Sequence, residues 1–461
     1  MTLKKSRMRD MTVGRPLPLL LSFAVPLIFG NLFQQLYSMV DAMIVGRYLG
    51  VNALAAVGCV DSLQHLIIGF CLSSCAGMAI PISQAFGAKD EKLLRRYVAN
   101  GVWLTGAMGV VMTVVTVLML RSILVWMQTP DNLMKDAYSY FVVILLGIPA
   151  TILYNMCSAI MRALGDSKRP LYFLILSSVL NVVLDLLFIM VFQWGCAGAA
   201  GATVLAQLVS GLCCLVYICR NLPIVHVRKE EWRPTWSYIG TLASMGFPMG
   251  IQASITSIGA VILSSAVNTL GSMAVAAIAT GQKVTRIINC AYDAMGTALA
   301  TFVGQNLGAR RLDRVAKGMT AANLTMVGYS IMAFLVVYFF GTGIALLYVS
   351  PSETELLDWV HTYLTCNGIC FWLMVLVINV RYTIQGLGYS KYAVFAGVCE
   401  MAARTIVAFT LVPMFGFTGA CFANGLAWLA ADLFLFPCYK VVKNKVRKKL
   451  EQLENADPHA V

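Results

Sequence analysis

Charged side chains are scarce in this chain of 461 residues. Asp, Glu, Lys and Arg make up 12% of the sequence, whereas hydrophobic residues make up 59%. Soluble globular domains carry about twice that share of charge, so the composition excludes a water-soluble protein of this length. The sequence consists largely of apolar segments, many of them near the roughly 20 residues that a helix needs to cross a bilayer. The composition predicts an all-α polytopic membrane protein.

Histidine is also rare, and the sequence motifs of several enzyme classes are absent. The four histidines, at positions 65, 226, 361 and 459, form no His-Glu-x-x-His zinc motif. No Gly-x-x-x-x-Gly-Lys-Ser/Thr loop is present to bind ATP, and the 14 cysteines have no metal-ligand spacing. We therefore expect neither an enzyme nor a bound cofactor.

Twelve apolar segments follow one another with short loops between most of them. We expect each segment to form one transmembrane helix. The predicted spans are 17–44, 52–82, 97–121, 135–161, 170–192, 196–219, 238–268, 274–303, 318–348, 358–385, 392–412 and 418–440.

The Lys and Arg residues gather on one side of these predicted spans. With the N-terminus inside, most of the 34 fall in cytoplasmic segments, and only Arg47, Arg121 and Lys135 fall outside. Because cytoplasmic loops are enriched in Lys and Arg, this asymmetry places both termini in the cytoplasm. The basic run KVVKNKVRKK (440–449) therefore indicates topology and contact with lipid headgroups, and we predict no nucleic-acid partner.

The two halves of the chain form an internal repeat at an offset of 221 residues. A Gln-x-x-Gly-Ala turn occurs in both halves, Gly195 matches Gly416, and LGDSK (164–168) matches LGYSK (387–391) after a local slip. Each half holds six spans, an even number, so the halves have the same orientation. The repeat predicts two parallel six-helix lobes with pseudo-two-fold symmetry and a cavity between them.

The sequence predicts that the chain is divided into five parts. These are a cytoplasmic N-terminal segment 1–16, an N-lobe 17–219, a cytoplasmic connector 220–237, a C-lobe 238–440 and a basic cytoplasmic tail 441–461. Duplicated lobes with charges inside the spans favour a transporter over a duplicated scaffold that transports nothing.

Three motifs carry a resemblance to a known family. They read GNLFQQLYSMVDAMIVGRYLGVNALAAVG (30–58), ISQAFGAKD (82–90) and VGQNLGARRLDR (303–314). Together they resemble the multidrug and toxic compound extrusion (MATE) family, and the resemblance extends over almost the whole chain. The major facilitator superfamily also has six plus six helices, but its Gly-x-x-x-Asp-Arg loop is absent here.

The resemblance implies a cation-coupled antiporter of the plasma membrane, that is, the bacterial inner membrane. Organic cations, drugs or metabolites would leave by alternating access while protons or sodium ions enter. One chain holds both lobes, so a monomer is sufficient. The alternative is a flippase for a lipid-linked precursor from the same broad superfamily.

The same resemblance assigns a cation-coupling site to the N-lobe. The family's acid positions map onto Asp41, Asn181 and Asp185, and Thr203 joins them. Asn181 and Asp185 are four residues apart, which places them on one helix face. A proton or a sodium ion at Asp41, Asn181 and Asp185 is the only bound ion that we expect. The alternative is that Asn181 and Asp185 merely hydrogen-bond neighbouring helices.

The first and seventh spans hold candidate hinges and substrate contacts. Pro26 and Pro248 lie within one residue of matching positions in the two halves, and the hydrogen bonds that proline removes would allow paired bending. Aromatic, amide and thioether side chains suit a deformable cavity for planar organic cations. The candidate cavity residues are Phe33, Gln34, Tyr37, Met39 and Gln252.

The C-lobe carries a second group of charges inside its spans. Glu400 and Arg404 are four residues apart, while Lys283, Arg286 and Asp293 share one span, with Arg286 and Asp293 two helical turns apart. The simpler interpretation is a set of mutually neutralising pairs that stabilise helix packing. The functional alternative is a network that contacts substrate or gates its passage.

Overall fold

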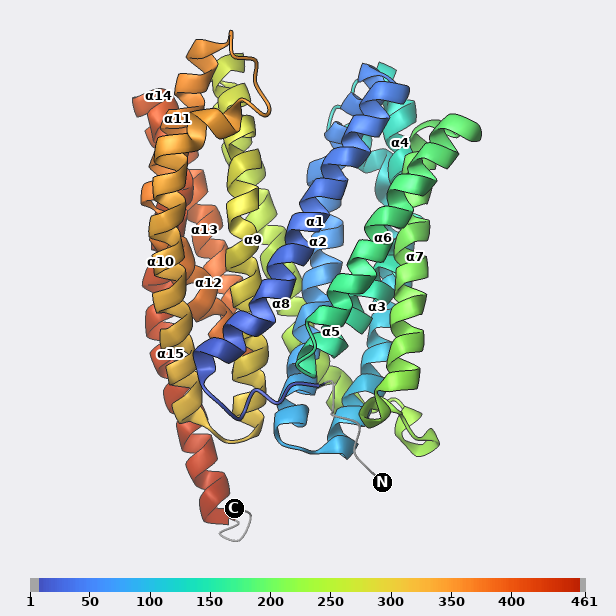
Figure 1. Ribbon diagram of the computed structural model, residues 1–461, viewed down its shortest axis with the longest axis vertical. Coiled ribbons are helices and arrows are strands. Elements are labelled where there is room, and N and C mark those ends of the chain that lie inside the picture. The colour runs from blue at the N-terminus through green and yellow to red at the C-terminus, as the bar shows by residue number, and fades with distance from the viewer. Residues whose placement is uncertain (1–7, 457–461) are drawn as a thin grey trace. The chain divides into compact units, whose positions relative to one another are not determined.

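The computed structural model describes residues 8–456 (Figure 1). Residues 1–7 of the predicted N-terminal segment and residues 457–461 of the predicted tail lie outside the described residues. Over the described range every regular element is a helix. The prediction of an all-α fold is therefore confirmed.

The first half of the chain forms seven α-helices and one short π-helical turn. The turn, η1, continues α6 directly. The elements are α1 (Pro16–Tyr48), α2 (Val51–Gly87), α3 (Glu91–Trp126), α4 (Asp131–Leu146), α5 (Ile148–Ala163), α6 (Lys168–Leu186), η1 (Leu187–Val191) and α7 (Gly195–Asn221).

The second half begins with two 3₁₀ turns in the connector and continues with eight α-helices. Its elements are η2 (Pro223–Val225), η3 (Lys229–Trp232), α8 (Trp236–Asn268), α9 (Ser272–Gly308), α10 (Leu312–Ala345), α11 (Thr354–Ile369), α12 (Phe371–Gly386), α13 (Lys391–Phe409), α14 (Leu411–Cys421) and α15 (Ala423–Ala456).

The repeat predicted from the sequence is confirmed by the helices themselves. Helices α1 and α2 have 33 and 37 residues, and so do α8 and α9. The turns match as well, because Lys89 and Arg310 adopt left-handed φ angles of 57° and 58° at positions 221 residues apart. Gly195 and Gly416 form a second matched pair, with φ angles of 60° and 57°.

Most of the helices are long and apolar enough to be transmembrane spans, and α14 is a shorter apolar helix. Within residues 8–456, nine helices are long and apolar enough to cross a membrane singly. The bent pairs α4–α5 and α11–α12 add two more, with bends of 46° and 48°. Helix α9 is less apolar and carries the charges Lys283, Arg286 and Asp293; we count it as the twelfth span because its 37 residues match those of α2 in the repeat.

The chain packs as two compact units whose limits fall inside helices. Within the described residues, one unit contains residues 8–10 together with Val25–Gly250, and the other contains Met11–Ala24 together with residues 251–456. The limits lie one residue from Pro26 in α1 and two residues beyond Pro248 in α8. The predicted lobes 17–219 and 238–440 differ from these units in the first parts of α1 and α8.

Close packing explains why the first part of α8 belongs with the N-terminal unit. A Cβ atom at Gly77 of α2 would lie 2.6 Å from the carbonyl oxygen of Met245 and 2.8 Å from the Cα atom of Gly246. Gly250 makes a similar approach, because a Cβ atom there would lie 2.3 Å from Ser74 Oγ. Small residues of this kind allow helix backbones to approach closely.

The connector is fixed to the same unit by polar contacts with α3. The guanidinium Nε of Arg95 donates to both carboxylate oxygens of Glu231, at 2.9 and 3.1 Å. The backbone N–H of Thr235 donates to Asn100 Oδ1 at 2.8 Å. The connector is therefore a docked segment, and α8 begins from a fixed point.

The segment that precedes α1 is held in the other unit by a corresponding set of contacts. The backbone N–H of Met11 donates to Gln305 Oε1 at 2.8 Å, and its carbonyl oxygen accepts from Asn306 Nδ2 and Arg314 Nη2, each at 3.2 Å. Gln305, Asn306 and Arg314 belong to the motif VGQNLGARRLDR. This part of the motif therefore has a structural role in anchoring the chain before α1.

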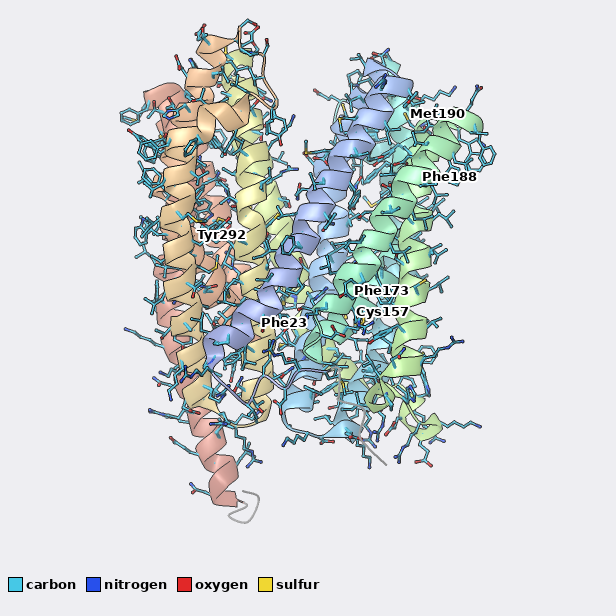
Figure 2. All side chains as sticks on the ribbon, in the orientation of Figure 1. Phe23, Cys157, Phe173, Phe188, Met190 and Tyr292 are labelled. Atoms are coloured by element: carbon cyan, nitrogen blue, oxygen red, sulfur yellow. The ribbon has the colours of Figure 1, made fainter. Side chains whose placement is uncertain are left out.

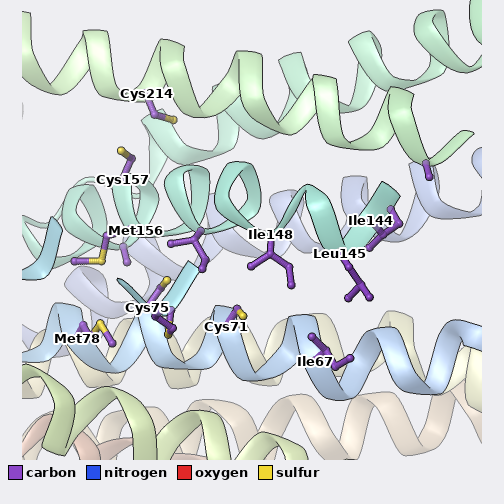
Figure 3. Packing of buried hydrophobic residues seen from close by; sticks show 14 of the residues in the cluster. Ile67, Cys71, Cys75, Met78, Ile144, Leu145, Ile148, Met156, Cys157 and Cys214 are labelled. Carbon is purple, nitrogen blue, oxygen red and sulfur yellow. The ribbon is translucent and has the colours of Figure 1, made fainter. Parts of the chain in front are cut away.

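Buried apolar side chains hold the N-terminal unit together. Figure 3 shows Cys71, Cys75 and Met78 of α2 near Ile148 and Met156 of α5. All 14 cysteines of the chain are free thiols, and seven of them are buried. The cysteines act as small core residues.

Candidate cation-coupling site

Helix α6 presents a polar pair on one face and apolar residues on the other. Asn181 and Asp185 are buried, with exposed fractions of 3% and 0%. Val179 and Val183, on the opposite face, are exposed by 59% and 56%. This division is expected for a helix that faces lipid on one side and neighbouring helices on the other.

Helix α1 brings Asp41 to the carboxyl group of Asp185. The two side chains interact by charge and are close enough to share a hydrogen bond. In the described part of the chain, neither oxygen of Asp185 has a hydrogen-bond donor, and the buried Oδ1 atom of Asp41 also lacks one. Two ionised carboxylates in such surroundings would repel each other strongly, because low polarity strengthens their Coulomb interaction. A proton or a cation at this pair would remove the repulsion.

Helix α7 supplies the remaining predicted residue. Helices α6 and α7 lie side by side (Figure 1), and Asn181 Nδ2 donates to Thr203 Oγ1 at 3.2 Å. The Oδ1 atom of Asn181 is buried and has no donor among the described residues. The four predicted residues thus form two pairs, Asp41 with Asp185 and Asn181 with Thr203, joined by one turn of α6.

The helix changes type immediately after Asp185. Residues Leu187–Val191 form the π-helical turn η1, in which the backbone N–H of Phe192 donates to the carbonyl oxygen of Leu187 at 3.0 Å. Phe188 in this turn lies near one end of the unit (Figure 2), and its ring centroid is 4.8 Å from that of Trp194. π-Helical turns occur often at functional sites. The apolar sequence here gives no signal for this turn.

A tyrosine that sequence analysis missed lies near the carboxyl pair. Tyr140 of α4 has an exposed fraction of 5% and interacts electrostatically with Asp41 and Asp185. Tyr37, one of the predicted cavity residues, also interacts with Asp41, and its hydroxyl bonds the side chain of Gln34. The sequence alone does not indicate Tyr140, because nothing in it shows which face of α4 lies toward Asp41 and Asp185.

The predicted cavity residues differ in exposure and belong to different units. Phe33 and Met39 on α1 are each 41% exposed, and Gln34 is exposed as well. Gln252 on α8 belongs to the C-terminal unit, where its amide lies 3.5 Å from Thr256 Oγ1. Its role as a cavity residue stays a prediction.

The predicted C-lobe charges only partly form one network. Glu400 pairs with Arg404, whose Nη2 atom lies 3.7 Å from Glu400 Oε2, so this predicted pair is confirmed. Glu400 also pairs with Arg381 of α12, which the predicted network did not include. Asp432 of α15 interacts electrostatically with Arg381 and Glu400 and was likewise missed.

The three charges on α9 do not neutralise one another. Within the described chain, no ion pair joins Lys283 or Arg286 to Asp293. Two helical turns separate Arg286 from Asp293 by about 10 Å along the axis, and their side chains do not bridge this distance in the structure. Lys283 instead places its Nζ atom 5.4 Å from the ring centre of Tyr348. The predicted pair Arg286–Asp293 is therefore wrong.

Twelve spans in two repeated halves, with carboxyl groups buried inside them, define a polytopic membrane transporter and not an enzyme. The family model described as MatE matches residues 26–187 and 248–410, one stretch in each half. The chain belongs to this family.

Several curated proteins are similar to the chain over most of its length. A probable multidrug resistance protein of Bacillus subtilis, YpnP, is 28% identical over 369 residues, which cover 78% of this chain and 82% of the relative. A second one from the same organism, YoeA, is 31% identical over 341 residues, covering 72% and 73%. The probable multidrug resistance protein NorM of Thermotoga maritima is 24% identical over 410 residues, covering 87% of each.

Solved structures show the same fold. A crystal structure of MATE in complex with MaL6 has a TM-score of 0.88 and 21% identity, and the match covers 96% of this chain and all of that one. An outward-facing multidrug resistance MATE family transporter of the MOP superfamily has a TM-score of 0.87 and 21% identity, covering 97% of this chain.

Proposed function

We propose that the protein is an antiporter that exports organic cations, drugs or metabolites in exchange for protons or sodium ions. The observation that supports this proposal most is the pair Asp41–Asp185, in which Asp41 Oδ1 and both oxygens of Asp185 are buried without a donor from the described residues. A coupling ion must bind and leave in every cycle, so its site cannot be neutralised permanently by a protein cation. No Lys or Arg ion-pairs with Asp41 or Asp185 in the described chain.

The same oxygens can take either coupling ion. A proton would let the two carboxyl groups share one hydrogen bond. A sodium ion, as a hard cation, would bind the carboxylate oxygens together with Asn181 Oδ1 and Thr203 Oγ1, by the oxygen preference that hard cations share. In both cases the ion permits α1 and α6 to pack closely, and its release makes that packing unfavourable. Alternation between these states is the proposed coupling step.

The remaining parts of the proposal concern location and substrate. The protein works in the plasma membrane with both termini in the cytoplasm, and a single chain is sufficient. Its curated relatives are named as multidrug resistance proteins, which supports drug-like substrates over a lipid-linked precursor. Substrate would contact the cavity residues Phe33, Gln34, Tyr37, Met39 and Gln252, with bending at Pro26 and Pro248.

The test is export of a fluorescent organic cation from membrane vesicles under separately imposed proton and sodium gradients. Wild type should export the dye under one of the two gradients, which names the ion. Asp41→Asn and Asp185→Asn should each abolish gradient-driven export at wild-type expression, because an amide cannot release a proton and lacks the charge that binds sodium. Asp131→Asn, at an exposed position at the start of α4, is the matched control. Full export by both site variants would refute the proposal.

A further inference from the structure

A second buried carboxyl group lies in the C-terminal unit. Asp432 on α15 is 3% exposed, and neither of its carboxyl oxygens has a hydrogen-bond donor among the described residues. Its neighbours along the same helix, Ala427, Ala431 and Leu435, are fully buried. An ionised carboxylate in such a place costs several kcal/mol unless it is paired.

The charged groups around Asp432 come from the two helices that pack most closely on α15. These helices are α12 and α13, and the groups that act on Asp432 are Arg381 from α12 and Glu400 from α13. Arg404 of α13 interacts with Glu400, and Asp293 of α9 interacts with Arg381. Both therefore influence Asp432 indirectly.

Arg381 is engaged with Glu400 but retains unused hydrogen-bonding capacity. Its Nη2 atom donates to Glu400 Oε1, whereas its buried Nε atom has no acceptor within residues 8–456. Glu400 has a second partner in Arg404, which also donates to the carbonyl oxygen of Thr256 at 3.5 Å. Glu400 would therefore keep a cation beside it if Arg381 turned to another carboxylate.

The size and composition of this cluster determine which ligand Asp432 can take. Glu400 is the carboxylate that acts on Asp432, and it is already paired with Arg381 and Arg404, so few oxygen ligands are left for a hard metal cation. Both oxygens of Asp432 are inaccessible to solvent, which excludes an organic cation. A proton is the ligand that fits.

We propose that Asp432 is a second proton-binding site and that Arg381 exchanges partners with it. In the geometry seen here, Asp432 holds its proton and Arg381 pairs with Glu400. When a water molecule reaches the carboxyl group of Asp432 in another conformation of the helices, the O–H bond breaks, the water accepts the proton, and Arg381 turns from Glu400 to the new carboxylate. The ion pair of Arg381 then links α12 to α15 instead of α12 to α13. This site is separate from Asp41 and Asp185 and goes beyond the function proposed above.

Infrared difference spectroscopy of the purified full-length protein tests this proposal without a transport assay. The spectrum between acidic and alkaline buffer reports protonated carboxyl groups through their C=O stretching band. Wild type should show a buried carboxyl band that Asp432→Asn removes. The band should persist in the double variant Asp41→Asn/Asp185→Asn, so the result does not depend on the N-lobe site. A spectrum of Asp432→Asn identical to that of wild type would overturn the proposal.

Glu400→Gln tests the partner exchange while leaving Asp432 in place. Without the Glu400 charge, Arg381 is free to pair with Asp432, so the Asp432 band should be lost at a pH at which wild type retains it. A carboxyl group with a purely structural role would keep its band in this variant. An unchanged band would therefore overturn the exchange, even if Asp432→Asn failed to fold. Asp131→Asn should match wild type in every spectrum.

Discussion

At the scale of residues, the sequence indicates where polar groups lie inside spans but not which ones meet. Asp185 could be recognised because an acidic residue inside an apolar run needs a partner or a role. Arg381 and Asp432 are equally unusual in their spans, yet their pairing depends on which faces of α12, α13 and α15 meet. That information comes only from packing. Resemblance to a family supplied the pairing of Asp41 with Asp185, and composition alone would not have done so.

Glu231 in the connector gives a prediction about how the stability of the fold depends on pH. Burial alone would raise the pKa of Glu231, but the hydrogen bonds from Arg95 and the backbone N–H of Arg228 outweigh it, so the pKa lies below the ordinary 4.5. A lowered carboxyl pKa means that the contact stabilises the fold fully above pH 4.5 and loses this effect as the pH falls through the folded-state pKa. Glu231→Gln should therefore lower the melting temperature at neutral pH.

The difference in melting temperature between wild type and Glu231→Gln should stay constant from neutral pH to about 4.5 and shrink at lower pH. Glu230→Gln, at the exposed neighbouring position, is the control and should melt like wild type throughout. A difference that grows on acidification would contradict the assigned direction of the pKa.

At the scale of elements, long apolar runs made the spans predictable from the sequence. The breaks and the π-helical turn within these spans were harder to predict, because they depend on local geometry. Pro149 marks the break between α4 and α5, because proline disfavours the helical conformation of the preceding residue and removes a hydrogen bond. The matching break before Phe371 has no proline, and η1 has no sequence signal. These features depend on contacts with neighbouring helices. The span of α9 was identified as an apolar segment like the others, despite its three charges.

The contact between α2 and α8 gives a prediction for a single glycine. Gly77→Ala would place a Cβ atom against the backbone of Met245 and Gly246, so it should lower the free energy of unfolding by about 1–3 kcal/mol through overpacking. Gly58→Ala, on the same helix with nothing within 4 Å of its added Cβ atom, should be neutral or slightly stabilising by helix propensity. Thermal unfolding in detergent compares the two, and equal effects would contradict the close approach.

At the scale of the whole molecule, the repeat could be recognised in the sequence because the turn residues keep their spacing even where the apolar residues between them differ. The offset of 221 residues reappears in the matched turns at Lys89 and Arg310. The limits of the two compact units could not be read in this way. They depend on Gly77 and Gly246 for α8, and on Gln305 and Arg314 for the segment before α1. No periodic pattern in the sequence reports such contacts.

The central claim is that Asp41 and Asp185 hold the coupling ion, and ion movement driven by substrate tests it most directly. Purified protein is reconstituted in liposomes with a gradient of the organic cation and no imposed ion gradient, and internal pH and sodium are followed. The account predicts that wild type moves one of the two ions against the flow of substrate and that Asp185→Asn moves neither, while Asp131→Asn behaves like wild type. Ion movement by Asp185→Asn at the wild-type rate would contradict the account.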